Sequence, residues 1–316
     1  MMKKTNKLFA LLLSALMLVS LAACGSGKDG KAAAKKLADD TAIMGVSFTA
    51  PEGYETVERT IEKTADGKLV SKSINYTLPD SGALAFAYTV AEGRDLNDEL
   101  KEYEEQGKVT RKEYNGTELI LYKSGKKTSM AFYQDGEDVY GVQYRASNEE
   151  TVDDEFDKIL QTVKYKKTTK TTLNEFTLDK VTYSLELDVP LYSESTTISA
   201  KPDGTLVKMS FVWKFGKDSE KTDYRFSIEE HKDTKLEELL KEDKEYEEKE
   251  IGGTTYTFEK GDESTDVYDH YNYYAQIGED VYVVQNKGVS NGWLVSRSEE
   301  SKKAFKTFIN SVKFGK

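Results

Sequence analysis

Alternation of large and small side chains predicts β-strands through most of the chain after its first 40 residues. In one run, Leu84, Phe86 and Tyr88 alternate with alanines. A period of two puts successive side chains on opposite faces of a sheet, so this run predicts a strand with its large residues on one face. Asp66-Gly67 and Asn115-Gly116 separate other strand-like runs, as hairpin turns do. We therefore expect antiparallel strands joined by tight turns.

Other segments carry the helical period. Leu96, Leu100 and Tyr103 recur at i, i+4 and i+7, and a second helical pattern runs over 152–163. Apolar residues at this spacing form a stripe that packs on a neighbouring layer. Residues 236–240 and 305–312 repeat the two patterns later in the chain. The sequence thus predicts helices packed on antiparallel sheets.

The order of these signals occurs twice. Gly136-Glu137-Asp138-Val139-Tyr140 returns unchanged as Gly278-Glu279-Asp280-Val281-Tyr282, and Asp66-Gly67 returns as Asp203-Gly204. Matches in series, 137 to 149 positions apart, indicate an internal duplication. We predict one domain at 41–167, a polar linker at 168–177 and a second domain at 178–316. The predicted fold class is α+β, with two tandem copies of an antiparallel sheet of about six strands flanked by helices.

Short motifs open and close the copies. Phe48-Thr49-Ala50-Pro51-Glu52-Gly53-Tyr54 opens the first copy. Ile159-Leu160-Gln161-Thr162-Val163-Lys164 closes it, and Phe308-Ile309-Asn310-Ser311-Val312-Lys313 closes the second. Together with the order of elements, these segments resemble PsbP-like domains. The resemblance implies a non-catalytic accessory or binding protein.

The N-terminal segment has the layout of a signal peptide. Three lysines precede an apolar run that is shorter than the roughly 20 residues a membrane-spanning helix needs. The run ends in Leu21-Ala22-Ala23-Cys24, which resembles the lipobox of bacterial lipoproteins. This resemblance implies removal of residues 1–23 as a lipoprotein signal peptide. It also implies diacylglyceryl and palmitoyl groups on Cys24.

A lipid-modified Cys24 determines the expected location. Two or more acyl chains hold a protein stably on a membrane, whereas one binds only marginally. We therefore expect the extracytoplasmic face of the bacterial cell membrane, with residues 24–40 as a flexible tether. The expected partners are the membrane, through the lipid on Cys24, and an envelope protein or a cell-wall component.

Charge and composition exclude several chemistries. The net charge of −11 argues against nucleic acid, whose binding depends on Lys and Arg. Cys24 is the single cysteine, so neither an intramolecular disulfide nor a cysteine-rich metal site is expected. The chain has two histidines and none of the common catalytic or nucleotide-binding motifs. We predict no catalytic residues, no metal and no other cofactor.

The candidate binding surface is aromatic and lies in the second copy. It comprises Tyr268, His270, Tyr271, Tyr273, Tyr274 and Trp293. Tyrosine combines an apolar ring with a polar tip, which suits recognition surfaces. Trp293 belongs to an insertion at 286–298 that the first copy lacks, and added loops often carry binding. Under the alternative interpretation, the tyrosines cover a sheet as ordinary strand residues and Trp293 packs on the core.

Three classes of function are compatible with this sequence. We favour a membrane-anchored extracytoplasmic lipoprotein that acts as a non-catalytic binding or scaffold module at the cell envelope. A solute-binding component of a transporter is the first alternative, although strands alternating with helices would be typical of that class. An envelope enzyme that uses only carboxylates or tyrosines is the second.

Overall fold

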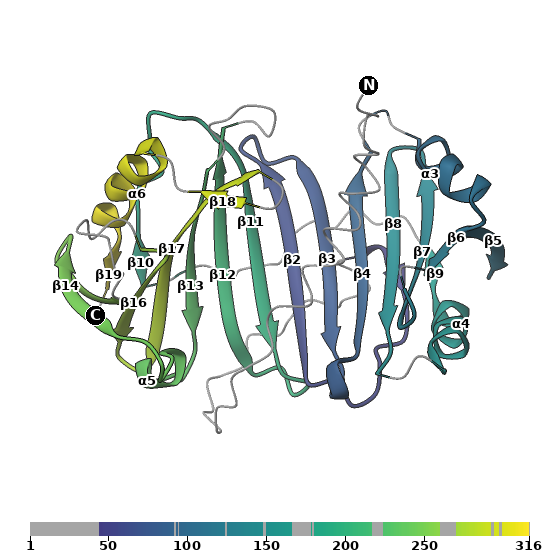
Figure 1. Cartoon of the computed structure of the whole chain (residues 1–316), viewed down its shortest axis with the longest axis horizontal. Coiled ribbons are helices and arrows are strands. Elements are labelled where there is room, and N and C mark those ends of the chain that lie inside the picture. The colour runs from purple at the N-terminus through teal and green to yellow at the C-terminus, as the bar shows by residue number, and fades with distance from the viewer. Residues whose placement is uncertain are drawn as a thin grey trace.

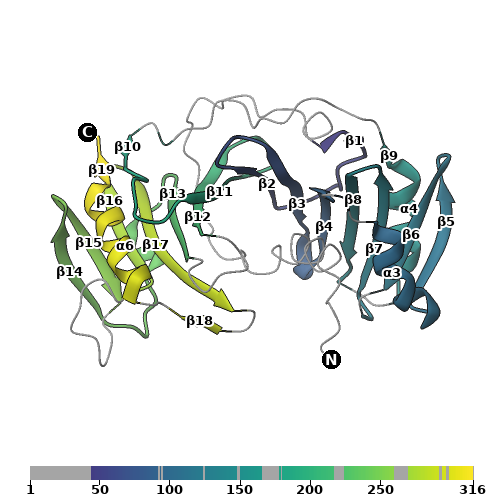
Figure 2. The same cartoon turned by 90° about the horizontal axis from the view of Figure 1, so that it is seen from above.

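The computed structural model describes residues 44–315, except for 92, 94, 124, 148–149, 166–177, 179, 217–223, 260–269, 292–293 and 297–298. At 224, 288–291 and 294–296 it describes the backbone alone. In these ranges, fifteen strands form one antiparallel sheet and four short strands form two separate pairs. Figure 1 shows the sheet running across the whole molecule, and Figure 2 shows its central strands arching between the two ends.

The first half of the sheet, called half one, contains seven strands. They are β2 (Thr56–Thr64), β3 (Leu69–Thr77), β4 (Ala83–Val90), β5 (Val109–Tyr114), β6 (Thr117–Lys123), β7 (Thr128–Asp135) and β8 (Asp138–Arg145). Their spatial order is β2-β3-β4-β8-β7-β6-β5. Helices α3 (Leu96–Glu105) and α4 (Val152–Thr162) pack on this half, with the 3-10 turn η2 (Pro79–Ser81) before β4. The short strand β1 (Val46–Ser47) pairs with β9 (Lys164–Tyr165).

Half two repeats this arrangement. Its strands are β11 (Leu191–Ala200), β12 (Leu206–Phe215), β13 (Tyr224–His231), β14 (Tyr246–Ile251), β15 (Thr254–Glu259), β16 (Asn272–Ile277), β17 (Asp280–Asn291) and β18 (Leu294–Ser296). The spatial order β11-β12-β13-β17-β16-β15-β14 is that of half one, and β18 pairs with the end of β17. Helices α5 (Leu236–Leu239) and α6 (Glu299–Ser311) accompany it, and β10 (Val181–Thr182) pairs with β19 (Lys313–Phe314).

The two halves join through their equivalent first strands. Strand β2 pairs with β11 so that Thr60 lies opposite Thr197, and their hydroxyl oxygens are 2.9 Å apart. These threonines are 137 positions apart, as are the turns Asp66-Gly67 and Asp203-Gly204. A pseudo-two-fold axis therefore passes through the threonine pair. Figure 1 shows its result, with α4 and α6 at diagonally opposite corners and α3 and α5 at the other two.

The predicted α+β class with two separate sheets is wrong, because the molecule is mainly β and a single sheet runs through both halves. Separate sheets would leave the edges of β2 and β11 unpaired, and backbone pairing satisfies both edges at once. The helix expected at 236–240 is also reduced to one turn, α5, with no buried residue. Side-chain periodicity does not reveal which strand edges meet.

One face of the sheet, called the α4/α6 face, carries an apolar core in both halves. In half one, Tyr76 and Phe86 pack with Phe156 and Leu160 of α4. In half two the corresponding core contains Trp213, Phe226, Phe305 and Phe308. Burying side chains of this size stabilises the fold by roughly 1.5–3 kcal/mol each. Trp213 is 2% exposed and belongs to the core of half two.

The other face, called the α3/α5 face, has an apolar core in half one. Leu96 and Leu100 of α3 cover a layer formed by Ala85, Ala87, Ile120, Met130 and Phe132. Asp95 begins this helix, since its carboxylate accepts a hydrogen bond from the Asn97 N–H at 2.8 Å. Half one is thus a sheet with apolar cores on both faces.

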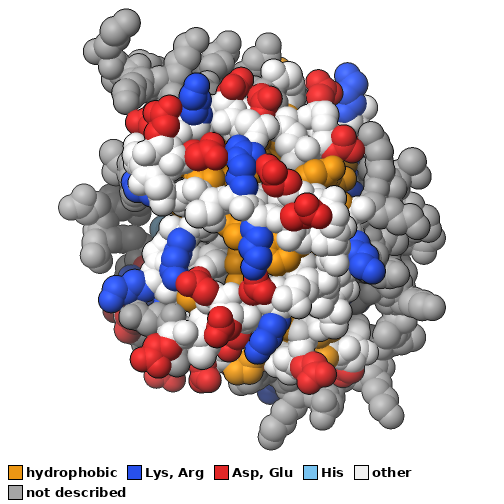
Figure 3. Space-filling model, turned by 90° about the vertical axis from the view of Figure 1, so that its right-hand side faces the viewer, with side chains coloured by type: hydrophobic (Ala, Val, Ile, Leu, Met, Phe, Trp, Pro, Cys, Tyr) orange, Lys and Arg blue, Asp and Glu red, His pale blue; other side chains and the backbone are white. Residues whose placement is uncertain are grey.

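Charged side chains cover the outer edge of half one. On β5, Arg111 lies 3.0 Å from Glu104 and 3.1 Å from Glu118, and Lys112 pairs with Asp157. Figure 3 shows Lys and Arg interspersed with Asp and Glu over this end of the molecule. Charges along an edge strand oppose pairing with another sheet. Among the described residues, no helix is long and apolar enough to cross a membrane.

Candidate binding face

On the α3/α5 face, half two has polar side chains where half one has an apolar core. The strand registers align the two sets. Ser227, Glu229, Thr257, Asn272 and Tyr274 take the positions of Ala85, Ala87, Ile120, Met130 and Phe132. Helix α5 has no buried residue, so it forms no counterpart to the core under α3. We call these five residues, together with His231, Gln285 and Lys287, the polar face of half two.

Glu229 is the electrostatic centre of the polar face. Its carboxylate lies 3.6 Å from both His231 Nε2 and Lys287 Nζ, and Ser210 Oγ donates to it at 3.5 Å. Burial opposes ionisation, but His231, Lys208 and Lys287 outweigh it and lower the pKa of Glu229 to about 2. Burial also lowers the pKa of Lys287, against the attraction of Glu229. The site holds an ionised carboxylate among basic groups.

An ordered chain of hydrogen bonds continues from this centre. Ser227 Oγ donates to Gln285 Oε1 at 2.7 Å, and Gln285 Nε2 donates to Asn272 Oδ1 at 2.7 Å. Tyr274 lies two residues after Asn272 on the same face of β16, and burial is the main reason that its pKa is raised. These groups come from β13, β16 and β17, so rigid strands set their positions.

The predicted aromatic residues separate between the two faces. Tyr273 is fully buried in the core on the α4/α6 face, and Tyr274 points to the opposite face. His270 packs against Phe258 with ring centroids 4.5 Å apart and ring planes tilted by 34°, and Tyr271 is 41% exposed. Tyr268 and Trp293 lie outside the described residues. The predicted insertion at 286–298 extends the sheet, since β17 continues to Asn291 and pairs with β18.

A second polar network in half two is closed on itself. Glu230, 3% exposed, lies 2.5 Å from both Lys232 Nζ and Tyr282 Oη. Lys232 Nζ is also 3.3 Å from Asp280. Each charge in this network has an opposite charge beside it, as buried charges require. We assign this network to stabilising half two.

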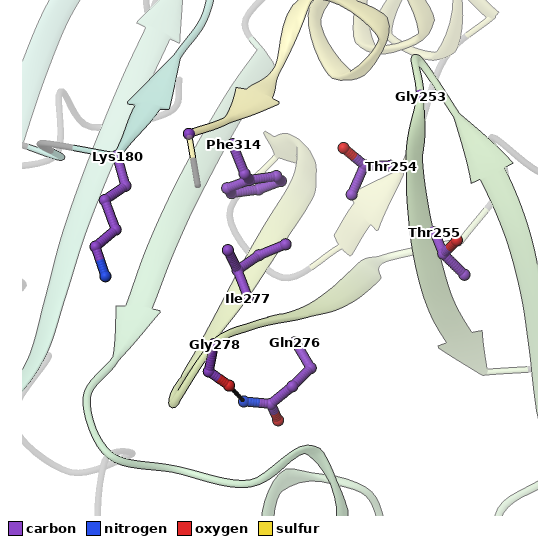
Figure 4. Close-up of a pocket in the computed structure, with 9 residues that line it drawn as sticks. Lys180, Gly253, Thr254, Thr255, Gln276, Ile277, Gly278 and Phe314 are labelled. Carbon is purple, nitrogen blue, oxygen red and sulfur yellow. Dashed lines mark hydrogen bonds between the residues drawn. The ribbon is translucent and has the colours of Figure 1, made fainter.

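An open pocket of about 550 Å³ lies at the far end of half two. The turns at Gly253 and Gly278, Gln276 and Phe314 help to line it (Figure 4). Gln276 Nε2 donates to Gly278 O at 3.0 Å, so this amide already serves the hairpin turn. Within the described part of the chain, no group of three or more His, Cys, Asp or Glu could hold a metal ion.

Sequence reasoning did not single out Glu229, Gln285 or Lys287. The signal was present in the repeat, because Ala85 and Ala87 of the first copy correspond to Ser227 and Glu229 of the second. Its meaning depends on which face these residues occupy, and the strand registers supply that.

The sequence matches no protein-family model and no curated protein. Among solved structures, a crystal structure of MucB in complex with MucA(peri) is similar at a TM-score of 0.18 and 6% identity, over 83% of this chain and 94% of that one. A Pseudomonas aeruginosa MucA/MucB complex is similar at a TM-score of 0.15 and 8% identity, over 87% and 96%. At these TM-scores the likeness carries no argument about fold, partner or activity.

Proposed function

We propose that this protein is a lipid-anchored extracytoplasmic lipoprotein of the bacterial cell envelope, and that half two binds a partner without catalysis. The observation that carries this proposal is the replacement of an apolar core by the polar face of half two. Half one shows that the same strands can carry a helix-covered core at this place. In half two that apolar burial is exchanged for ordered polar groups, which suit recognition.

Several features of the polar face support binding in preference to acid–base catalysis. A general acid or base works best with a pKa near the operating pH, whereas the pKa of Glu229 is about 2. The side chains of Glu229 and His231 are 16% and 20% exposed, so a partner can reach them. The proposed partner is an envelope protein or a cell-wall component, and the lipid on Cys24 would keep the protein near it.

Site-specific photo-crosslinking in intact cells tests this function. A photoreactive residue would replace Tyr274 on the polar face or, as the matched control, Lys306 on the exposed side of α6. We expect a discrete adduct from position 274, weakened by Glu229→Gln, and none of that mass from position 306. Identical adducts from both positions, or no adduct from position 274, would contradict the proposal.

Point variants are preferable to deleting half two. Deletion would remove β11 and expose the edge of β2, so any lost partner could reflect altered folding. Tyr273 is equally unsuitable for substitution, because it is a core residue. Tyr271→Ala is a milder surface variant for the same comparison.

A further inference from the structure

The α3/α5 face of the four central strands is a polar floor. Three central rows across β2, β3, β11 and β12 place twelve side chains on this side, and eleven of them are polar. They are Glu58, Thr60, Glu62, Ser71, Ser73, Asn75, Ser195, Thr197, Ser199, Lys208 and Ser210, with Val212 as the exception. A sheet face that carries so little apolar surface does not serve as a hydrophobic core.

One row of this floor, which continues onto β4 and β8, contains buried hydrogen-bond acceptors without a partner. Lys208, Ser199, Glu58, Asn75, Ala85 and Gln143 are successive neighbours across six strands. Asn75 is 5% exposed, and neither its Oδ1 nor Gln143 Oε1 has a partner among the residues described. A buried polar atom without a partner lowers stability, so such atoms in a native fold call for an explanation.

The symmetry-related row shows that the fold does not need these unused groups. Val212 occupies the position equivalent to Asn75, 137 residues later. Gln285 occupies the position of Gln143, and there Ser227 and Asn272 complete its hydrogen bonds. Beside Gln143, the positions equivalent to Ser227 and Asn272 are occupied by Ala85 and Met130, which have no polar side chain. The unused acceptors therefore belong to one row only.

The chemistry of the row specifies its ligand. Asn75 and Gln143 present acceptors, Lys208 presents a donor, and burial raises the pKa of Glu58. Five strand spacings of about 4.8 Å give the row a length of roughly 24 Å. An extended peptide uses its backbone groups best at a sheet edge, whereas hydroxyl and acetamide groups can meet separate side chains across a face.

We propose that this row binds a neutral oligosaccharide with acetamide groups, whose N–H and O–H groups donate to Asn75 and Glu58. The inference rests on the proposed function and gives its binding a ligand class. The ligand would lie across β12, β11, β2, β3, β4 and β8, and its β12 end would be next to the polar face of half two. Glu229 and His231 border the row through Ser210 and Lys208 of β12.

Titration calorimetry on the full chain tests the inference, with a hexamer of N-acetylglucosamine as the probe and a hexamer of glucose for comparison. We expect saturable binding of the first probe and weaker binding of the second. Asn75→Leu should reduce affinity roughly tenfold or more while leaving the unfolding midpoint unchanged or higher, because it removes a buried carbonyl oxygen that has no hydrogen-bond partner. Val212→Leu, at the symmetry-related position, should bind like the wild type.

Lys208→Met is a second test variant if Asn75→Leu does not fold, and Lys303→Met on the exposed side of α6 is its control. Lys208→Met should weaken binding and Lys303→Met should not. The inference is overturned if neither hexamer binds, or if Asn75→Leu and Lys208→Met both bind like the wild type. If the crosslink from position 274 is still formed in that case, the proposed function stands. If oligosaccharide binding and the crosslink are both absent, the inference and the proposed function are both overturned.

Discussion

One pair of equivalent residues in the two halves differs by a buried charge. Lys72 is 4% exposed, and its Nζ lies 4.8 Å from the centre of the Tyr88 ring. Burial lowers its pKa to about 8, and the charge of Asp138 only partly offsets this. The equivalent position in half two, 137 residues later, is Met209. Half two therefore shows that an unbranched apolar side chain fits this place.

We expect Lys72→Met to stabilise the protein at pH 7. The unfolded chain holds the lysine proton up to a pKa of about 10.5, whereas the folded chain releases it near pH 8. Wild-type stability should therefore rise between pH 8 and 10.5 and approach that of the variant. Urea unfolding at pH 7 and pH 10 measures both values. A variant less stable than the wild type at pH 7 would show that the contacts with Tyr88 and Asp138 outweigh the burial.

Removing the charge of Glu229 should destabilise the protein at pH 7, whereas removing that of Lys72 should stabilise it. The folded pKa of Glu229, about 2, lies below the ordinary glutamate value of 4.5, so the stabilisation from its ionised carboxylate is complete above pH 4.5 and is lost as pH falls toward 2. Glu229→Gln should cost on the order of 3 kcal/mol at pH 7. The difference from the wild type should shrink between pH 4.5 and 2 in acid-unfolding curves. Glu248→Gln, at an exposed position of β14, is the matched control and should change the free energy of unfolding little.

Cys24 gives a prediction that is independent of the fold. Cys24→Ser should abolish lipid attachment, because the Cys24 sulfur is the atom that would carry the diacylglyceryl group. Mass spectrometry of the purified chain and detergent phase partitioning measure the outcome. A variant that still enters the detergent phase as the wild type does would contradict lipid anchoring at this residue.

Among the elements, α3 and α5 show how the underlying strands determine a helix. Leu96 and Leu100 of α3 are fully buried over the apolar layer of half one. Leu236 and Leu240 have the same spacing in sequence, but Glu229 and Tyr274 lie on the strands where half one offers alanine and phenylalanine. Without an apolar layer to cover, the segment keeps a single helical turn.

A matched pair of substitutions measures this difference. Leu100→Ala should destabilise the protein by about 2–5 kcal/mol, as truncations of fully buried leucines do. Leu239→Ala, in a half-buried position of α5, should cost clearly less, below about 1.5 kcal/mol. Chemical denaturation of both variants gives the comparison. Equal losses would mean that α5 packs as tightly as α3.

The sequence predicted strands and turns better than it predicted faces. The turns at Asp66-Gly67, Asn115-Gly116 and Gly136 all connect hairpins in the structure. The aromatic composition groups Tyr273 and Tyr274 as one surface, but neighbouring strand residues point to opposite faces. The polar face of half two could be recognised only once the strand registers aligned it with the core of half one.

At the scale of the whole molecule, the junction between β2 and β11 determines the architecture. A second β2 could in principle take the place of β11, with Thr60 opposite Thr60. That pairing would set Glu58 opposite Glu62 twice, and like charges directly opposite each other destabilise strand pairs. In the chain itself, Ser199 faces Glu58 and Ser195 faces Glu62. Two serines at the positions equivalent to Glu62 and Glu58 thus favour pairing between different halves.

The two glutamates of β2 determine how a fragment containing residues 41–167 should behave. With its glutamates intact, the fragment should pair poorly through β2 at neutral pH. Glu58→Ser combined with Glu62→Ser removes the facing charges and should convert the fragment into a dimer with Thr60 at its two-fold axis. Sedimentation equilibrium measures the change, and circular dichroism shows whether each fragment keeps its strands. A dimer that tightens with the substitutions and is lost with Thr60→Pro would place the contact on β2, since proline cannot donate to a central pair. If the folded double variant stays monomeric, charge repulsion is not what prevents two β2 strands from pairing. The preference of β2 for β11 must then come from the apolar residues on the α4/α6 face.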